Sequence, residues 1–208
     1  MSTKVKICGI TNLADAQAAI AAGADMLGFV FYDQSPRFIT LPAAAEITRH
    51  LPPYVLRVGL FVNADEAFVF SAMQAGGLHL LQFHGEEPPE FCSQFGMMTI
   101  KAFRISDAAS LADLPRYATD AYLLDAYTPG IRGGTGHRFN WELAVQATEF
   151  GKPIFLAGGL TPENVGEAVR QVRPFAVDVS SGVEHAPGKK DPAKMQAFIA
   201  AVRAADAA

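Results

Sequence analysis

Short hydrophobic runs recur along the chain and alternate with longer stretches in which apolar residues follow a helical period. Most of these runs are continuously apolar, which is typical of strands that are buried on both faces. Their first residues lie 20 to 33 positions apart. The pattern predicts eight strands, over Val5–Cys8, Met26–Phe31, Val55–Val62, Leu78–His84, Met98–Phe103, Ala121–Asp125, Ile154–Ala157 and Phe175–Val179.

The stretches between the runs are rich in alanine and predict amphipathic helices. Polar residues mark several helix starts: Asn63 followed by Glu66 predicts a capping box. Thr161 and Asp191 each stand before a proline, which suits the first position of a helix. The segment near Ala108–Leu114 predicts only a weak, short helix. The other predicted helices are Leu13–Ala22, Ala43–Leu51, Ala64–Ala75, Trp141–Phe150, Pro162–Val172 and Pro192–Ala205.

The alternation of strands and helices predicts parallel strands joined by right-handed crossovers. Two architectures satisfy this pattern, an open doubly wound sheet and a closed (β/α)8 barrel. The open sheet usually carries a Gly-x-Gly-x-x-Gly turn after its first strand, and the segment from Cys8 to Thr11 does not match it. Eight unbroken units favour a single TIM barrel domain over residues 1–208, with lean loops because the fold needs about 200 residues.

Composition and charge exclude several functional classes. The charged fraction is 18%, the formal charge is −4 and the pI is near 5.7, so nucleic acid is not an expected partner. No apolar run approaches the roughly 18 residues of a membrane span. Two cysteines and no signal peptide indicate a cytoplasmic protein. Zinc signatures and a Walker loop are absent, and His79 and His84 stand at odd separation on one strand, so we expect no metal and no cofactor.

Glycine-rich turns follow the seventh and eighth predicted strands. In barrels of this kind, chemistry lies at the carboxyl ends of the strands, and these two ends commonly hold phosphate groups. Backbone N–H groups can approach a phosphate closely because glycine has no Cβ. A double glycine by itself is equally consistent with a simple tight turn. Two such turns at neighbouring strand ends, however, predict a phosphate site formed by Gly158, Gly159, Ser180, Ser181 and Gly182.

Four further candidates, Cys8, Arg37, His84 and Asp125, stand at strand ends or in the loops that follow. Each also has a structural interpretation: a small buried thiol, a solvated arginine, a hydrogen-bonded histidine and a capping carboxylate. Together, a thiol and a carboxyl at one barrel mouth, with an arginine and a phosphate site, indicate proton transfer on a phosphorylated sugar. Such an isomerisation needs a base for a carbon-bound proton and an acid for an oxygen, and no metal where the substrate supplies its own electron sink.

Several sequence blocks occur in a characteristic order and at barrel spacing. They are Lys6–Thr11, Ser35–Arg37, Gly59–Asn63, Gln82–Gly85, Asp125 with Gly133–Gly136, Ala157–Leu160, Asp178–Glu184 and Gly188–Asp191. Over essentially its whole length, the chain resembles the phosphoribosylanthranilate isomerase family of tryptophan biosynthesis. Two residues depart from the usual pattern of the family, Phe83 where leucine is commoner and Asn140 where aspartate is commoner. Asparagine also caps helices, so neither departure affects the resemblance.

The resemblance implies the Amadori rearrangement of N-(5-phosphoribosyl)anthranilate to 1-(2-carboxyphenylamino)-1-deoxyribulose 5-phosphate, by acid–base catalysis without a cofactor. It assigns Asp125 as the general acid and Cys8 as the general base. It further implies that Arg37 binds the anthranilate carboxylate with its planar fork. His84 and Asp178 are then substrate or intermediate contacts.

These roles place opposite demands on the two pKa values. A free thiol has a pKa near 8.5, so a positive neighbour of Cys8 is expected to lower it, and Lys6 on the same strand face is a candidate. Asp125 must hold a proton before the reaction, so we expect burial to raise its pKa. The glycine-rich stretch Ala126–Arg138 resembles a lid after the sixth strand.

Two alternatives stay open at this stage, another phosphosugar-processing barrel enzyme and a non-catalytic phosphosugar-binding barrel. An indole-glycerol-phosphate synthase is disfavoured by the chain length and by the absence of its lysine–glutamate pattern. A ribulose-phosphate epimerase would need metal-binding histidines and aspartates, which the strand ends lack. A binding protein is expected to lose the acid or the base, whereas Cys8 and Asp125 are both present. We expect a monomer rather than a homodimer, acting on a small-molecule phosphoribosyl anthranilate.

Overall fold

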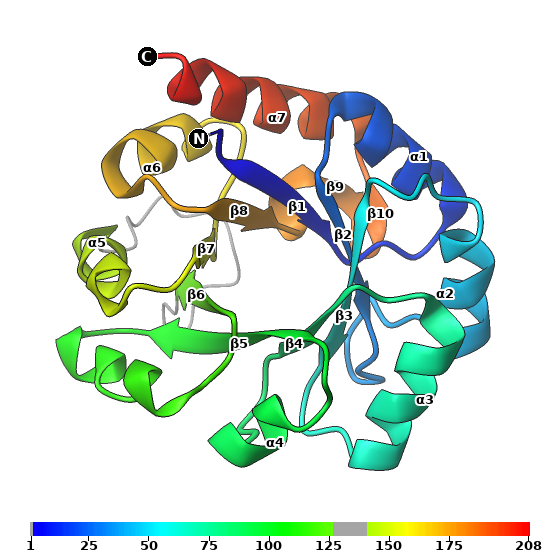
Figure 1. The fold of residues 1–208 in the computed structure, drawn as a ribbon. Helices are drawn as coiled ribbons and strands as arrows, with labels where there is room; N and C mark the ends of the chain where they lie inside the picture. The colour runs from blue at the N-terminus through cyan, green and yellow to red at the C-terminus, as the bar shows by residue number, and fades with distance from the viewer. Residues whose placement is uncertain (1, 127–140) are drawn as a thin grey trace.

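The computed structural model describes residues 2–126 and 141–208, and eight parallel strands within them close into a barrel. In Figure 1 the strands form a ring at the centre and the helices surround it. Strand β1 (Lys4–Cys8) pairs with β8 (Ala176–Val179) and closes the ring, so the predicted (β/α)8 barrel is confirmed. The other barrel strands are β2 (Met26–Val30), β3 (Leu56–Phe61), β4 (Leu80–Phe83), β5 (Met98–Ile105), β6 (Ala121–Ala126) and β7 (Ile154–Ala157).

The helices follow the predicted order with small differences at their ends. The segment near Ala108–Leu114 forms two short 3₁₀ turns, η1 (Ala108–Leu111) and η2 (Leu114–Arg116). The structure adds a hairpin that was not predicted, formed by β9 (Glu184–Ala186) and β10 (Lys189–Lys190). The helices are α1 (Leu13–Ala22), α2 (Leu41–Thr48), α3 (Glu66–Gly76), α4 (Pro89–Ser93), α5 (Trp141–Ala147), α6 (Val165–Val172) and α7 (Pro192–Asp206), with 3₁₀ turns η3 (Thr148–Phe150) and η4 (Ser181–Val183).

Side chains inside the barrel differ from those between the barrel and the helices. Because successive strand residues point to opposite faces, Leu80 of β4 packs into the barrel centre whereas Leu81 packs against the helices. A central apolar layer that includes Met26 and Phe155 fills the interior. The barrel is therefore a packed core rather than a pore. The interior also buries polar side chains near its carboxyl end, and these belong to the site described below.

Two predicted helix caps are wrong and one is confirmed. Asp65, not Asn63, caps α3: its side chain accepts the N–H of Phe68. Asn63 instead adopts a left-handed conformation, with φ of 50°, and its side chain accepts the N–H of Glu86. Thr161 begins a turn rather than a helix, and α6 starts after Asn164. Asp191 caps α7 as predicted, through the N–H groups of the following turn.

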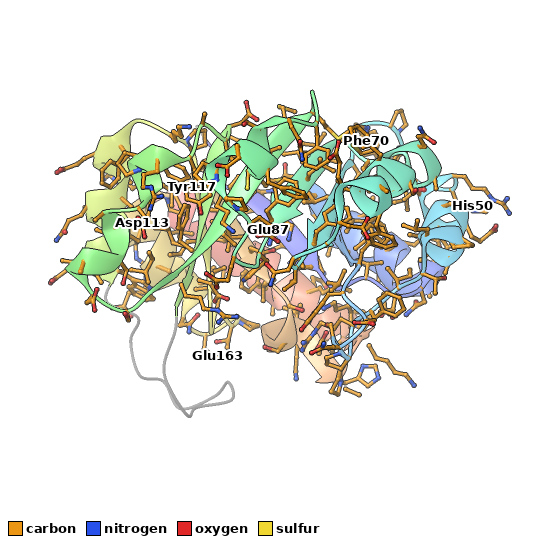
Figure 2. The ribbon with its side chains drawn as sticks, turned by 90° about the horizontal axis from the view of Figure 1, so that it is seen from below. His50, Phe70, Glu87, Asp113, Tyr117 and Glu163 are labelled. Atoms are coloured by element: carbon orange, nitrogen blue, oxygen red, sulfur yellow. The ribbon has the colours of Figure 1, made fainter. Side chains whose placement is uncertain are left out.

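A buried ion pair supports the loop after β4. Lys101 of β5 lies 2.7 Å from Glu87, and both side chains are almost fully buried. The two carboxylate oxygens of Glu87 also accept the N–H groups of Asn63 and Gly85, and its carbonyl accepts the hydroxyl of Tyr117. Figure 2 shows Glu87 and Tyr117 on the same side of the barrel. This cluster anchors the segment that follows β4.

The two ends of the described chain lie together at the amino end of the barrel (Figure 1). The carboxylate of Asp206 accepts the backbone N–H and the hydroxyl of Thr3, at 2.8 and 2.6 Å. In the part of the chain that the structure describes, no helix is long and apolar enough to span a membrane.

Candidate active site

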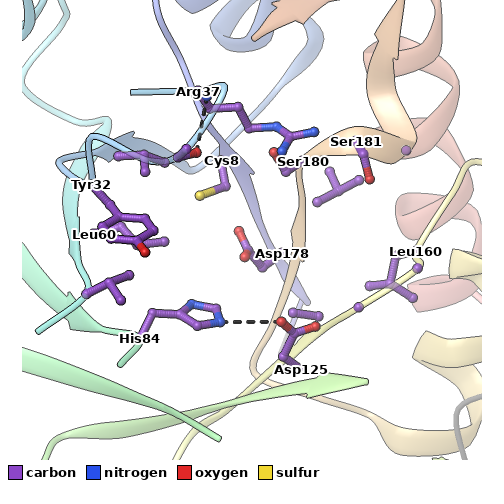
Figure 3. Close-up of a pocket in the computed structure, with 18 residues that line it drawn as sticks. Cys8, Tyr32, Arg37, Leu60, His84, Asp125, Leu160, Asp178, Ser180 and Ser181 are labelled. Carbon is purple, nitrogen blue, oxygen red and sulfur yellow. Dashed lines mark hydrogen bonds and ion pairs between the residues drawn. The ribbon is translucent and has the colours of Figure 1, made fainter. Parts of the chain in front are cut away.

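A cavity of about 340 Å³ opens at the carboxyl ends of the barrel strands. Its lining brings together every residue that the sequence analysis proposed for the site: Cys8, Arg37, His84, Asp125, Gly158, Gly159, Asp178, Ser180, Ser181 and Gly182. Figure 3 shows their arrangement, with Asp178 between Cys8 and Asp125. Residues up to 174 positions apart in the sequence meet here because all eight parallel strands end at this side of the barrel.

An ion pair between Lys6 and Asp178 lies beside the thiol of Cys8. Lys6 precedes Cys8 by two residues, so both side chains point into the barrel, where Lys6 is completely buried. The Lys6 ammonium lies 2.8 Å from the carboxylate of Asp178, its register partner on β8. Gly28 on β2 leaves the space for this arrangement, because a Cβ there would lie 2.8 Å from the Cys8 sulfur and 3.0 Å from the Lys6 nitrogen. The sequence analysis did not identify Gly28.

Opposing effects act on the pKa of the Cys8 thiol. Burial raises it, the charge and hydrogen bond of Lys6 lower it, and the nearby charge of Asp178 raises it. The net result is a pKa above the usual thiol value. Lys6 is the predicted positive neighbour, but its effect on the thiol pKa is smaller than that of burial. For Lys6, burial lowers the pKa, whereas Asp178 and Cys8 raise it to a value above normal. Lys6 therefore remains charged beside the thiol.

A chain of polar side chains leads from the barrel interior to Asp125. Gln82 of β4 is fully buried, and its amide nitrogen lies 3.0 Å from Nδ1 of His84. Nε2 of His84 lies 3.3 Å from Oδ2 of Asp125, as the dashed line in Figure 3 marks. With the Gln82 amide donating to Nδ1, Nε2 carries the ring proton and donates to Asp125. Among the described residues, Oε1 of Gln82 has no hydrogen-bond partner.

The expected burial of Asp125 is not found. Its side chain is 34% exposed, more than the 21% of His84. The side chain of Asp125 points into the barrel, but Asp125 lies near the carboxyl end of β6, where the barrel interior opens to the cavity. The predicted lid Ala126–Arg138 lies, apart from Ala126, outside the described residues.

Arg37 is not a free loop arginine. Its Nε and Nη2 donate to the two carboxylate oxygens of Glu184, at 2.9 and 2.6 Å. This pairing raises the pKa of Arg37, chiefly through the hydrogen bond to Glu184. The edge of the guanidinium formed by Nε and Nη2 is thus occupied, and the edge formed by Nη1 and Nη2 remains for a ligand in the cavity. The sequence contained no signal for this contact, which joins residues 147 positions apart.

The two glycine-rich turns lie side by side in the cavity wall. Gly158 and Gly159 have φ of 83° and 65°, a conformation that favours glycine. Within the described residues, no hydrogen bond uses the backbone N–H of Gly159. At Gly182 a Cβ would collide with the carbonyl oxygen of Leu160, so this glycine also has a structural reason. The turns form a concave surface with backbone N–H groups suited to a phosphate.

Apolar side chains line the opposite part of the cavity. Val30, Tyr32, Leu60 and Val62 come from the ends of β2 and β3 or from the loops that follow them. They provide a surface for a flat apolar group in the cavity. Across the described ranges, no three histidine, cysteine or acidic side chains are grouped to hold a metal ion.

Comparison with known proteins agrees with this geometry. The family model for N-(5′-phosphoribosyl)anthranilate (PRA) isomerase matches residues 5–201. The chain belongs to the phosphoribosylanthranilate isomerase family. A member of this family from Geobacter sulfurreducens is 56% identical over 196 residues, which cover 94% of this chain and 96% of the relative.

Solved structures of phosphoribosylanthranilate isomerases superpose on most of the chain. The enzyme from Thermotoga maritima has a TM-score of 0.92 and 43% identity, over 97% of this chain and 99% of that one. A complex of such an isomerase with reduced 1-(o-carboxyphenylamino)-1-deoxyribulose 5-phosphate has a TM-score of 0.89 and 40% identity, with the same coverage. Monomers generated from the dimeric Thermotoga maritima enzyme have a TM-score of 0.87, 40% identity and again the same coverage.

Proposed function

We propose that this member of the isomerase family converts N-(5-phosphoribosyl)anthranilate to 1-(2-carboxyphenylamino)-1-deoxyribulose 5-phosphate, with Asp125 as general acid and Cys8 as general base. The observation that carries the assignment is the position of the two groups on different walls of one cavity, which the two glycine-rich turns also line. The complex named above holds a reduced form of this product. The two alternatives, another phosphosugar enzyme and a non-catalytic binding barrel, do not agree with the family membership.

Asp125 protonates the ribose ring oxygen and opens the ring. His84 donates from Nε2 to Oδ2 of Asp125, which leaves Oδ1 to carry the proton that is transferred. Opening the ring forms an iminium ion at C1′, and the electron pair of the broken C–O bond goes to the ring oxygen. Because the iminium withdraws electrons, the proton at C2′ becomes acidic, and the substrate acts as its own electron sink.

Cys8, as the thiolate, removes the proton from C2′. Lys6 favours the thiolate through its charge, and the Lys6–Asp178 pair holds that charge in place. The resulting enolamine gains a proton at C1′ and loses the proton of the 2′-hydroxyl, which gives the ketone. Overall one hydrogen moves from C2′ to C1′, and the proton that Asp125 gave up is replaced by the one that leaves the hydroxyl.

The two ends of the substrate carry the charges that hold it. The phosphate binds to the backbone N–H groups of the turns at Gly158–Gly159 and Ser180–Gly182, and the anthranilate carboxylate binds to Arg37. The aryl ring lies against the apolar side chains near Tyr32 and Leu60. Asp178 lines the cavity between Cys8 and Asp125 (Figure 3), where it contacts the sugar.

A coupled assay tests the activity directly. N-(5-phosphoribosyl)anthranilate is generated in situ, and the loss of its fluorescence is followed after this protein is added. We expect a decay whose rate is proportional to the protein concentration and which does not change when a chelator is present. No acceleration over the spontaneous decay of the substrate would contradict the proposal.

We also infer that the protein is a cytoplasmic monomer. The described surface exposes the large apolar side chains of Tyr54, Met98 and Phe175 at the amino end of the barrel. Sedimentation equilibrium over a hundredfold range of concentration distinguishes the two states. A constant mass of one chain supports the monomer, and a mass of two chains overturns it.

A further inference from the structure

A partly exposed arginine, Arg37, and a buried lysine, Lys190, share the carboxylate of Glu184 beside the cavity. The carboxylate of Glu184 accepts hydrogen bonds from Nε and Nη2 of Arg37. The ammonium of Lys190 lies 2.7 Å from Oε1 of Glu184. The side chains of Lys190 and Glu184 are 0% and 5% exposed. Burial alone raises the pKa of Glu184, but the hydrogen bonds from Arg37 and Lys190 lower it below its usual value. The group therefore holds two positive charges against one negative charge.

This cluster reaches both ends of the proposed substrate. Lys190 contacts the carbonyl and hydroxyl oxygens of Ser180, at 3.3 and 3.4 Å, and Ser180 belongs to the proposed phosphate site. Arg37 also lines the cavity, as Figure 3 shows. The excess positive charge suits a substrate that has an anionic group at each end.

The hairpin that carries Glu184 and Lys190 is fixed without the help of Arg37. Strands β9 and β10 pair through these two residues. The carbonyl of Gly188 accepts the hydroxyl of Thr11 at 2.6 Å, and the N–H of Lys190 donates to the α1 carboxylate of Asp15 at 2.9 Å. The hairpin is thus tied to the segment after β1 by contacts that do not involve Arg37.

We propose that Glu184, held by Lys190, is a positioning residue for Arg37 and thereby determines the selectivity for a carboxylated aryl substrate. Glu184 does not touch the substrate. It occupies one edge of the guanidinium, which restricts the side chain to one rotamer and turns the other edge toward the cavity. The inference rests on the proposed role of Arg37. It assigns to Glu184 and Lys190 a function that a merely structural ion pair would not have.

The experiment compares two substrates, N-(5-phosphoribosyl)anthranilate and N-(5-phosphoribosyl)aniline, which lacks the carboxylate. Their ratio of kcat/KM is measured for the parent protein, Arg37→Ala, Glu184→Gln and Lys190→Met. Arg37→Ala is expected to lower kcat/KM for the anthranilate by about 10- to 150-fold, the scale of one charge-assisted contact, and to remove the selectivity.

Glu184→Gln keeps the shape of the side chain but can accept only one of the two N–H groups of Arg37. We expect its selectivity ratio to fall about tenfold, through a higher KM for the anthranilate and little change for the aniline substrate. Lys190→Met removes the second cation and is expected to change the ratio in the same direction by less. In the double variant Arg37→Ala/Glu184→Gln, the ratio should equal that of Arg37→Ala alone.

Glu87→Gln is the matched control, because Glu87 is equally buried and lies at the same 2.7 Å from a lysine. We expect it to lower the Tm and leave the selectivity ratio unchanged. If Glu184→Gln lowers kcat/KM for both substrates equally, as an unspecific loss of structure would, the inference is overturned. If Arg37→Ala keeps the parent's selectivity, the proposed role of Arg37 is wrong. This failure is recognised from the Arg37→Ala variant alone, without the Glu184 variants.

Discussion

The two walls of the cavity hold their proposed catalytic groups by different means. On the first wall, formed by β1 and β8, Cys8 lies beside the Lys6–Asp178 ion pair, and Lys6 has no exposed surface. On the second wall, formed by β4 and β6, Asp125 is 34% exposed and is reached through the hydrogen bonds of Gln82 and His84.

The difference corresponds to what each group must do. A thiol becomes a useful base only as an anion, and burial opposes that charge, so a fixed cation has to lie beside it. A carboxyl that gives up a proton and takes one back in each cycle works best where it can reach both the substrate and water. The first wall thus depends on charge, and the second on orientation.

Removing either proton-transfer group should have the largest effect. Cys8→Ala and Asp125→Asn are each expected to lower kcat at least ~10²-fold, the lower end of acid–base contributions, while circular dichroism shows a folded barrel. Both walls would then be shown to be essential. Near-parental turnover in either variant would refute the role of that residue.

Lys6→Met tests whether the first wall depends on charge. It leaves Asp178 buried without its partner, at a cost of about 3 kcal/mol of unfolding free energy, and it removes the cation that lowers the pKa of Cys8. The thiol pKa should rise further, so alkylation of Cys8 by iodoacetamide should require a higher pH. Urea denaturation and the pH dependence of alkylation, in a Cys92→Ala background, measure the two effects.

A double variant, Lys6→Met/Asp178→Leu, is the control for stability. Removing both charges leaves no unpaired buried ion, so much of the lost stability should return, whereas alkylation should still require a higher pH than in the parent. An unchanged alkylation profile in Lys6→Met would show that the cation does not tune the thiol.

Gln82→Leu tests whether the second wall depends on orientation. The substitution removes the donor to Nδ1 of His84, so the imidazole is free to take the other tautomer and stop donating to Asp125. We expect kcat to fall about fivefold, the value of roughly one neutral hydrogen bond, with a change in the acidic limb of the pH–rate profile. Since the amide oxygen of Gln82 has no partner in the described structure, stability should not fall in parallel. A loss of stability without a change in the pH profile would indicate a packing role only.

The smallest expected effect is on stability and concerns Cys92, a thiol that does not line the cavity. Cys92 of α4 is buried, and burial raises its pKa to about 12. A pKa that is higher in the folded state than in the unfolded state stabilises the protein below the unfolded value, and this stability is lost as the pH rises from about 9 toward 12. At pH 9.5 the unfolding free energy should be lower by about 1 kcal/mol per buried thiol than at pH 7. Cys92→Ala should flatten this dependence, and an equally steep profile in the variant would exclude Cys92 as its source.

Much of the fold could be predicted because its signals are local. Continuous apolar runs such as Ile154–Ala157 and the helix Leu13–Ala22 have the observed bounds. An error in the predicted caps arose where two residues close together in the sequence were both suitable. Asn63 and Asp65 are both good caps, and Asp65 was chosen because Glu87 binds the N–H of Asn63 and holds it in a left-handed conformation. No local pattern contains that information.

The sequence by itself determined the barrel, the order of its strands and ten of the residues that line its mouth, since the alternation of apolar runs and helices allows few parallel arrangements and their strand ends meet at one side. Only the tertiary structure decided how these residues are held. The Arg37–Glu184 contact, the Lys6–Asp178 pair and the space left by Gly28 each join different strands or loops. Such contacts depend on register across the closed barrel and on burial, which sets the strength of every charge in it, and neither quantity can be read along one chain.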